Sequence, residues 1–406
     1  MNNKFLKTLI EPFQALRNKT FAKLYLAQTI SLIGDAFTWV GLALLAYEID
    51  KERSSIILAT ALTLRVTAFI VFSPFAGVLA DRVERKKILY FTHFVRMSIV
   101  ACLPFITSEL QIYGLVFFLN VFNAFFTPTY RAIIPQIVVG KYFREAIGLS
   151  TATFQLLGVL GPGLAGVVAV WLGAREIFLV DALSFVLAAV LILAIPKADL
   201  QKGVVDAGKN PKNAWAEVIK GISLLFGNKL LRFALSIEFV SAIAGAMILV
   251  NTISHVKNEL QLDDKYYGWV MAAFGIGASI AAFASGIIDK SKSRSVSLIS
   301  GALLLGVSVC FANYANYPVF VGLWILAGLG QSLAEIPSET LIGENISSEN
   351  QGKVYGSHFA FSHLWWAIAY PIAGYMGNRF PENDFLYGGI LTLVVGLLAV
   401  VIFRSR

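Results

Sequence analysis

Three ionisable residues, Asp35, Arg65 and Glu238, lie inside long apolar stretches of the sequence. Ionisable side chains are costly at membrane depth, so they are uncommon there unless they take part in transport or form a buried pair. Asp35 and Arg65 fall near the middles of two consecutive antiparallel stretches, and we therefore expect them to lie at comparable depth and to pair. The chemistry that these residue types offer is the binding and release of a proton.

The expected pair between Asp35 and Arg65 has two interpretations. It is either a permanent structural salt bridge or a site where Asp35 exchanges a proton while Arg65 adjusts its proton affinity. Glu238 lies about two turns into its stretch and has no obvious basic partner nearby in sequence. An acid in such apolar surroundings binds a proton readily, so we predict that Glu238 is a second proton carrier. The alternative is a hydrogen-bonded acid that stays neutral throughout.

The composition identifies the surroundings of these residues. Of the 406 residues, 57% are hydrophobic and 14% are charged, and the mean hydropathy is +0.70. A soluble domain carries about 25% charged residues, so this chain lacks the polar surface that water requires. A membrane-spanning helix needs about 20 apolar residues. Runs of that length predict twelve spans, at 21–47, 56–80, 88–107, 112–133, 149–172, 177–195, 231–254, 267–288, 296–314, 318–338, 354–377 and 385–403.

Basic residues are unevenly divided between the predicted loops. If the N-terminus is inside, most Lys and Arg residues fall in cytoplasmic segments, and the external segments hold few. Cytoplasmic loops of membrane proteins are enriched in these residues. The pattern therefore predicts a multi-pass protein with both termini in the cytoplasm. It also accounts for the net charge of +8 without a nucleic-acid partner.

The first and second parts of the chain resemble each other when they are shifted by 208 or 209 positions. Phe75–Asp81 then falls on Phe283–Asp289, and Cys102 falls on Cys310. The repeat predicts an all-α protein of two six-helix halves, with the substrate site near the midplane between them. The later part of the linker should form an amphipathic helix on the membrane surface. The expected parts are an N-terminal half at 1–195, a cytoplasmic linker at 196–230 and a C-terminal half at 231–406.

The loop after the second predicted span reads Gly77-Val-Leu-Ala-Asp81-Arg82-Val-Glu84-Arg85-Lys86-Lys87. It resembles the signature loop of the major facilitator superfamily, Gly-x-x-x-Asp-Arg-x-x-Arg-Lys-Lys, and the resemblance covers essentially the whole chain. Further motifs, such as Ser31–Asp35 and Asp181–Phe185, look like the branch that contains bacterial macrolide-efflux proteins and the enterobactin exporter. The resemblance implies the twelve-helix fold of that superfamily and a transporter in a bacterial inner (plasma) membrane.

The resemblance and the chemistry of the loop together predict a cytoplasmic gate. A carboxylate at the end of a span can accept hydrogen bonds from the N-terminus of a neighbouring helix, and basic side chains can pair with acids or lipid headgroups. An acid near the cytoplasmic end of the tenth span is expected to join an inner-gate ion pair. The predicted gate residues are Gly77, Asp81, Arg85, Lys86, Asp289 and Glu335.

The fifth span contains small residues and a proline whose role the sequence leaves open. The stretch from Gly158 to Gly166 resembles the glycine-proline motif of exporters in the superfamily. Small residues allow helices to approach closely, whereas proline bends a helix. The residues that have either a packing or a hinge role are Gly158, Gly161, Pro162 and Gly166.

Polar and aromatic residues within the spans are predicted to line a broad amphipathic substrate cavity. They are Gln28, Trp39, Asn120, Asn123, Gln155, Gln331, Phe361 and Trp365. The sequence has no phosphate-binding loop, no nucleophile elbow and no zinc-protease motif. His358 and His363 are five residues apart, which is not metal-ligand spacing on a helix. We therefore expect no enzymatic activity, no cofactor and no metal.

These features together predict a monomeric secondary transporter that exports an amphipathic organic compound, of the drug, macrolide or siderophore class, by alternating access. The expected driving force is proton antiport through Asp35 and Glu238, and the expected partners are the small-molecule substrate, protons and membrane lipids. The alternatives are a lysophospholipid or other lipid transporter or flippase, an uptake symporter, and a membrane sensor built on a transporter fold.

Overall fold

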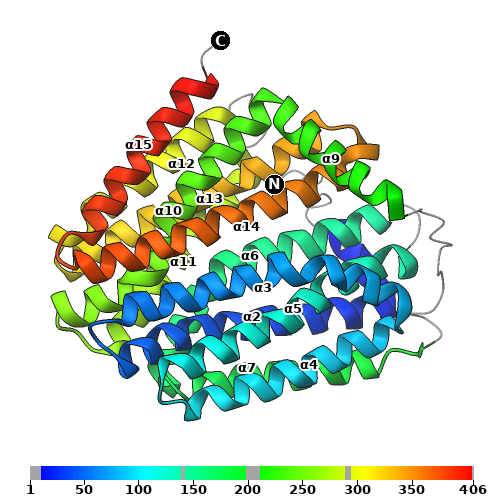
Figure 1. The fold of residues 1–406 in the computed structure, drawn as a ribbon, viewed down its shortest axis with the longest axis horizontal. Coiled ribbons are helices and arrows are strands. Elements are labelled where there is room, and N and C mark those ends of the chain that lie inside the picture. Colours follow the sequence, from blue (N-terminus) through cyan, green and yellow to red (C-terminus); the bar gives the residue numbers. More distant parts are fainter. Residues whose placement is uncertain (1–10, 139–141, 198–210, 289–293, 405–406) are drawn as a thin grey trace. The chain divides into compact units, whose positions relative to one another are not determined.

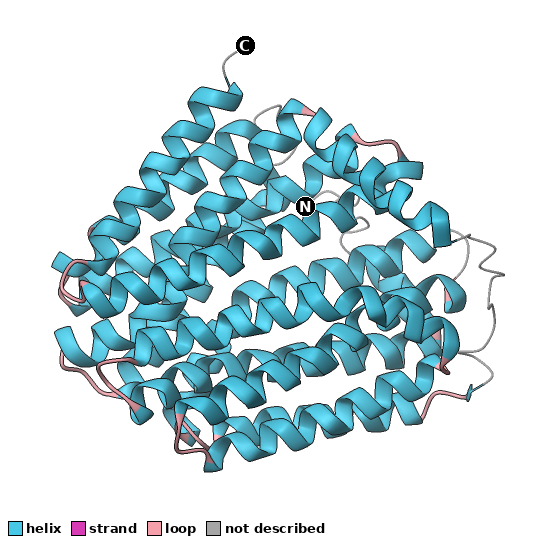
Figure 2. Cartoon of the chain, in the orientation of Figure 1, coloured by secondary structure: helices cyan, strands magenta, loops and turns pink. Residues whose placement is uncertain are grey.

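The computed structural model describes residues 11–138, 142–197, 211–288 and 294–404 (Figure 1). Within these residues the chain is almost entirely helical, and no strand occurs among them (Figure 2). Twelve of the described helices take the places of the twelve predicted spans, which confirms the predicted all-α fold class. Six of them precede residue 198 and six follow residue 210.

The first six of these helices are α2 (Lys19–Ile49), α3 (Ser54–Arg82), α4 (Arg85–Cys102), α5 (Glu109–Ile137), α6 (Tyr142–Leu172) and α7 (Ile177–Leu193). The second six are α10 (Lys229–Ser254), α11 (Asp264–Ile288), α12 (Arg294–Cys310), α13 (Tyr317–Asn345), α14 (Ser348–Arg379) and α15 (Asp384–Arg404). Shorter elements are η1 (Glu11–Arg17), η2 (Leu103–Phe105), η3 (His255–Glu259) and η4 (Ala312–Tyr314).

A further helix, α9 (Pro211–Gly227), lies where the sequence predicts the amphipathic helix of the linker. Val218 and Ile219 are both exposed on it. Glu217 forms an ion pair with Lys353 of α14, with Oε2 and Nζ 2.6 Å apart. Residues 198–210 of the predicted linker lie outside the described residues. The position of α9 at the membrane surface stays a prediction.

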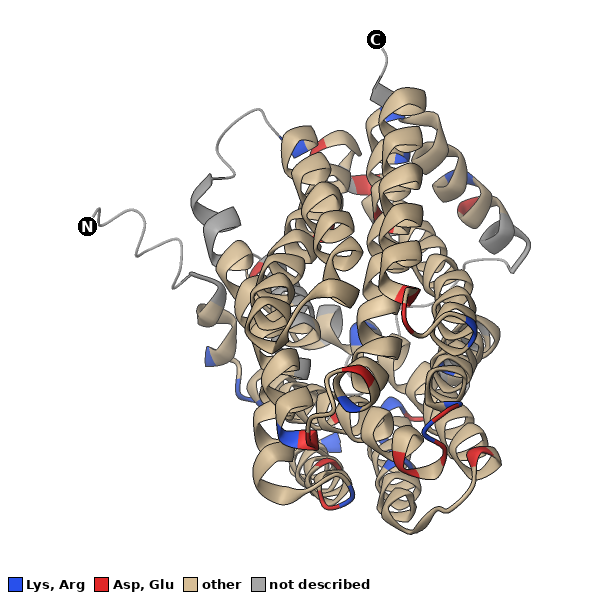
Figure 3. Ribbon diagram, turned by 90° about the vertical axis from the view of Figure 1, so that its left-hand side faces the viewer, with Lys and Arg blue, Asp and Glu red and all other residues tan. Residues whose placement is uncertain are grey.

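Length and composition alone qualify eight of the described helices as membrane spans. The number becomes nine if Gly163–Leu172 and Ile177–Leu193, which meet at 118°, are taken as one broken span. Charged residues are sparse along most of the helices' length (Figure 3). A helix with so few charges and so many apolar residues is stable in lipid because its backbone hydrogen bonds are all made internally. The chain is therefore a multi-pass membrane protein.

The residues group into two compact units. One consists of the described residues within Met1–Gly41, Thr67–Gly161 and Arg175–Ala207, and the other of those within Leu42–Val66, Pro162–Ala174 and Gly208–Arg406. This grouping follows contacts, and its limits differ from the predicted boundaries at 195 and 231. The division into 1–195, 196–230 and 231–406 stays a prediction.

The first unit has a core of large apolar side chains. Phe21 and Leu24 of α2 are fully buried beside Phe126 and Ile133 of α5 and Ile192 of α7. The helix α4 packs along both α5 and α7. The polar residues discussed below are held in place by this core, because its closely packed side chains leave little freedom to the helices.

The second unit is built around α10. Nearly every residue of this helix from Leu231 to Ile253 is buried, and α10 packs against α12, α13, α14 and α15. The neighbouring helices α11 and α13 approach so closely that a side chain on Gly277 would overlap the carbonyl of Ile325. Small residues at such crossings let helix backbones meet, which is the usual way in which helices associate within a membrane.

Candidate functional site

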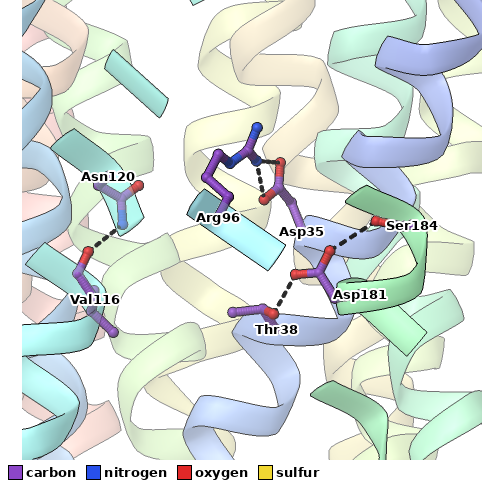
Figure 4. Close-up of polar contacts among 7 residues, drawn as sticks. All are labelled: Asp35, Thr38, Arg96, Val116, Asn120, Asp181 and Ser184. Atoms are coloured by element: carbon purple, nitrogen blue, oxygen red, sulfur yellow. Dashed lines mark hydrogen bonds and ion pairs between the residues drawn. The ribbon is translucent and has the colours of Figure 1, made fainter. Parts of the chain in front are cut away.

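An ion pair between α2 and α4 lies within the first unit. The Nη2 atom of Arg96 is 2.8 Å from Oδ1 and 2.9 Å from Oδ2 of Asp35 (Figure 4). The side chain of Arg96 is 1% exposed and that of Asp35 is 17% exposed. Asp35 thus has a basic partner, Arg96, that differs from the predicted one, and the predicted pairing with Arg65 stays a prediction. The sequence places Arg65 at a suitable depth, but the packing of the helices brings the guanidinium of α4 to the carboxylate.

Aromatic rings surround the guanidinium of Arg96. Its central carbon lies 4.1 Å from the ring centroid of Phe185 and 5.7 Å from that of Phe126. A guanidinium gains free energy from such ring faces, and the rings also keep water away. His93, three residues earlier on α4, is fully buried between the same rings. Neither of its ring nitrogens has a hydrogen-bond partner among the described residues.

A second carboxylate, that of Asp181 on α7, belongs to the same cluster. It is fully buried and accepts hydrogen bonds from Thr38 and, at 3.0 Å, from Ser184 (Figure 4). Both Asp35 and Arg96 act on it electrostatically. The helices α2 and α7 meet closely here because Gly34 has no side chain, and a Cβ there would overlap the Ser184 hydroxyl. We name Asp35, Arg96 and Asp181 the charge cluster.

The charge cluster holds two carboxylates and one guanidinium. If both acids were ionised, one negative charge would remain unbalanced in a buried place, where an uncompensated charge is costly. A proton on either carboxylate removes that charge. This arrangement can therefore bind one proton and release it when its surroundings change.

Glu238 of α10 has a partner within the second unit. Its Oε1 atom lies 2.8 Å from Nε2 of His358 on α14, and both side chains are buried. The sequence shows no basic residue nearby because His358 is 120 positions away and reaches Glu238 only through the packing of α10 against α14. Such a pair exists either as an ion pair or as a neutral pair, and the two forms differ in where one proton resides.

Gln331, Glu335 and Tyr370 form another polar group in the second unit. Nε2 of Gln331 donates a hydrogen bond to Oε1 of Glu335. Glu335 and Arg65 both act electrostatically on the buried Tyr370. Arg65, which the sequence assigns to Asp35, is thus an electrostatic neighbour of a tyrosine on α14. The predicted role of Glu335 in a cytoplasmic gate stays a prediction.

Two of the predicted cavity residues, Trp365 and Phe361, contact neighbouring helices. Trp365 donates a hydrogen bond of 3.1 Å to the carbonyl of Leu235 and packs against Phe239. The ring of Phe361 lies 4.9 Å from that of Phe226 on α9. These are packing contacts, because an aromatic side chain at a helix crossing fills the space between the helices. Substrate contact by Trp365 and Phe361 stays a prediction.

The remaining predicted cavity residues differ in their surroundings. Asn120 is fully buried and donates to the carbonyl of Val116 on its own helix (Figure 4). Gln28, Trp39 and Asn123 are partly buried. The side chain of Gln155 lies outside the described residues. Substrate contact by these residues stays a prediction.

The basic loop of the predicted gate makes its described contacts inside the first unit. Lys86 donates to the carbonyls of Leu193 and Ile195, at 2.9 and 2.6 Å, at the C-terminal end of α7. These contacts differ from the expected pairing of Lys86 with acids or headgroups. A helix end with unpaired carbonyls attracts a cation, which explains the contact. Arg85 is partly buried, and Gly77, Asp81 and Asp289 lie outside the residues whose side chains are described.

Glu84 in the same loop pairs with Lys197, with Oε1 and Nζ 2.6 Å apart. The hydrogen bond from Lys197 holds the pKa of Glu84 below its ordinary value of 4.5. Glu84 in the loop and Lys86 in the first turn of α4 thus both tie this segment to the end of α7.

The glycines of α6 lie in different surroundings. A Cβ on Gly158 would meet nothing within 4 Å, whereas one on Gly161 would lie 2.6 Å from Cβ of Ala36 on α2. A Cβ on Gly166 would overlap the carbonyl of Gly268 on α11. Gly161 and Gly166 therefore permit close packing of helices. The side chain of Pro162 lies outside those described, and the hinge role stays a prediction.

Comparison with known proteins places this sequence in a family. The family model described as Major Facilitator Superfamily matches residues 24–254 and 234–406. "Macrolide efflux protein A" of Streptococcus pyogenes is 23% identical over 403 residues, covering 95% of this chain and 96% of that protein. "Multi-drug resistance efflux pump PmrA" of Streptococcus pneumoniae is 24% identical over 365 residues and covers 88% of each chain. "Uncharacterized MFS-type transporter YfiS" of Bacillus subtilis is 25% identical over 402 residues, covering 94% and 93%.

Solved structures show the same fold. The nucleoside transporter NupG superposes with a TM-score of 0.74 at 10% sequence identity, covering 95% of this chain and 100% of that one. A POT family transporter superposes with a TM-score of 0.70, also at 10% identity, covering 94% and 96%. These structures support the fold alone, whereas the family model spans nearly the whole sequence. The chain belongs to the Major Facilitator Superfamily and is a membrane transporter.

Proposed function

We propose that this transporter exports an amphipathic organic compound by alternating access and that inward proton flow drives the export. The orientation with both termini in the cytoplasm, in a bacterial inner membrane, and the monomeric state are parts of this proposal. The named relatives support export, since two of them are efflux proteins. The asymmetry of basic residues supports the orientation.

The observation that carries the proton part of the proposal is the charge cluster. Arg96 contacts Asp35 directly, and both residues interact electrostatically with Asp181. One guanidinium balances one of the two acids, so the cluster is close to neutral with one proton bound and negative without it. A change of one charge in a buried place alters the free energy of a conformation by several kcal/mol.

In the proposed cycle, a proton that enters from outside binds to one of the two carboxylates. Arg96 then compensates the other carboxylate, and the neutral cluster favours the conformation that opens to the cytoplasm. Release of the proton to the cytoplasm restores the negative charge and favours the opposite conformation once the exported compound has bound. Thr38 and Ser184 hold the carboxylate of Asp181 through hydrogen bonds to its two oxygens, so the proton-binding group keeps its position during the cycle.

An experiment with everted membrane vesicles tests this proposal. We expect a labelled compound from a panel of macrolides, cationic dyes, siderophores and lysophospholipids to accumulate inside when the lumen is made acidic. An uncoupler should abolish the accumulation. Accumulation that ignores the pH gradient would contradict proton antiport, and accumulation of lysophospholipids alone would favour a lipid transporter. Transport only in the opposite direction would favour an uptake symporter.

A further inference from the structure

Gln331 on α13 has a buried carboxamide of which only one end is satisfied. The side chain is 5% exposed, and its Nε2 atom donates to Glu335. Its Oε1 atom has no hydrogen-bond partner among the described residues. A buried carbonyl without a donor is rare in folded proteins and calls for an explanation, such as a ligand or an ordered water.

The orientation of this carboxamide is fixed by its neighbour. If nitrogen and oxygen were exchanged, the carbonyl oxygen of Gln331 would face the acceptor atoms of Glu335, which would repel it. Oε1 therefore points away from Glu335. On that side lies Gly245 of α10, where a Cβ would be 3.4 Å from Oε1 of Gln331.

Gly245 also lies against the indole of Trp366 on α14. The same Cβ would be 2.6 Å from Cη2 and 3.3 Å from Cζ3 of that ring. The ring of Trp366 is 5.3 Å from that of Tyr370, with an angle of 38° between them. The open acceptor of Gln331 thus lies near the indole of Trp366, which packs against Tyr370, at a point where α10 carries no side chain.

We propose that Oε1 of Gln331 accepts a hydrogen bond from the transported compound, beside the indole of Trp366, which can lie this close to α10 only because Gly245 has no side chain. The compound should carry a hydrogen-bond donor, either a protonated amine or a hydroxyl group, next to an apolar surface. The two aromatic rings suit the apolar part, and the carboxamide oxygen suits the donor. This inference rests on the proposed function, because it assigns to the exported compound an atom of the protein that recognises it.

Binding to the purified full chain in lipid nanodiscs tests the inference. The probes are erythromycin, its quaternary N-methyl derivative, which lacks the N–H but keeps the hydroxyl groups, and tetraphenylphosphonium, which has no donor. Gln331→Leu should weaken the binding of erythromycin about tenfold, the effect of one hydrogen bond, and should leave tetraphenylphosphonium unchanged. Equal weakening of the quaternary derivative would identify a hydroxyl group as the donor, and no weakening of it would identify the amine.

A glycine substitution gives an independent measurement with Gln331 intact. Gly245→Ala should also weaken erythromycin at least tenfold, because the added methyl group displaces the indole. Gly396→Ala on α15 is the control, since its Cβ would make an ordinary contact of 3.7 Å with Val240 of α10, and it should bind as the wild type does. Each variant must first show the same yield and thermal midpoint as the wild type.

Three outcomes would overturn the inference. If Gln331→Leu and Gly245→Ala both bind erythromycin as tightly as the wild type, a water satisfies the oxygen, and the proposed export function is unaffected. If Gln331→Leu weakens tetraphenylphosphonium equally, the residue shapes the site without accepting a hydrogen bond. If the wild type binds none of the probes and transports none of them, the proposed function fails and this inference fails with it.

Discussion

Arg96 on α4 places one guanidinium nitrogen, Nη2, within 2.9 Å of both carboxylate oxygens of Asp35 on α2. The contact joins two helices that are about sixty residues apart in sequence, and a second carboxylate, that of Asp181, lies close to it. A transporter that couples to protons needs a buried acid whose charge changes the stability of its conformations. The charge cluster has the composition that this role requires.

Arg96→Gln should be strongly destabilising, because it leaves the carboxylates of Asp35 and Asp181 without a counter-charge. Loss of one partner of a buried pair costs about 3–5 kcal/mol, so we expect a low yield of folded protein and a lower thermal midpoint. The double variant Asp35→Asn with Arg96→Gln removes both charges of the pair and should regain much of the lost stability. A double variant no more stable than Arg96→Gln alone would show that the pair is not the source of the loss.

Arg96→Lys tests whether transport depends only on the positive charge at this position or also on the shape of the guanidinium group. Lysine keeps the positive charge but loses the planar contact with Phe185 and the simultaneous contact with both oxygens of Asp35. We expect a folded protein with a reduced rate of proton-driven export. Export at the wild-type rate would mean that only the charge at this position matters.

Gly161→Ala and Gly158→Ala form a matched pair on α6. The methyl group at 161 would lie 2.6 Å from Cβ of Ala36, and overpacking of this kind costs about 1–3 kcal/mol. The methyl group at 158 would meet no atom within 4 Å, so that variant should be as stable as the wild type. The thermal midpoints in detergent test the difference, and equal midpoints would contradict the close packing of α6 against α2.

The pair between Glu84 and Lys197 predicts a small dependence of stability on acid pH. The hydrogen bond from Lys197 lowers the pKa of Glu84 below 4.5, so the ionised acid stabilises the folded protein above that value. The contribution is lost as the pH falls through the lowered pKa, because the folded protein must then take up the proton. Lys197→Met should reduce the difference between the thermal midpoints at pH 6 and at pH 3.5. An unchanged difference would show that the pair does not persist in solution.

His358→Gln should alter the pH profile of transport, because histidine titrates between about pH 5 and 8 and His358 contacts Glu238. The matched control is His363→Gln on the same helix, since His363 contacts the carbonyl of Phe359 in its own helix. We expect a changed profile for the first variant and the wild-type profile for the second, measured as initial rates of export in everted vesicles. If both variants keep the wild-type pH profile, His358 takes no part in the proton-dependent steps of transport.

The sequence predicts the helices well and the pairs poorly, for a physical reason. Apolar runs of span length locate all twelve helices, because each helix satisfies its own backbone in lipid and needs only local information. The partner of Asp35 depends instead on which helix faces α2. Depth along the membrane, the only quantity that the sequence offers, suits Arg65 and Arg96 alike. His93 and Arg96 share a face of α4, and the sequence favours structural pairing for them near the loop that contains Asp81.

Asp181 illustrates the same limit. Its position near the start of a span makes it look structural, and its closeness to Asp35 follows from the contact that Gly34 allows between α2 and α7. Likewise, the partner of Glu238 becomes visible only when α10 packs on α14. A glycine inside an apolar span, such as Gly34, is the sequence signal that could have indicated a close contact between two helices.

Proton release on addition of the exported compound tests the central claim most directly. In everted vesicles with a fluorescent pH indicator, we would compare the wild type with Asp181→Asn and with Glu176→Gln, an exposed acid five residues earlier. We expect Asp181→Asn to bind the compound but release no protons, and Glu176→Gln to behave like the wild type. Wild-type proton release per transported molecule in Asp181→Asn would contradict the assignment of the charge cluster as the proton site.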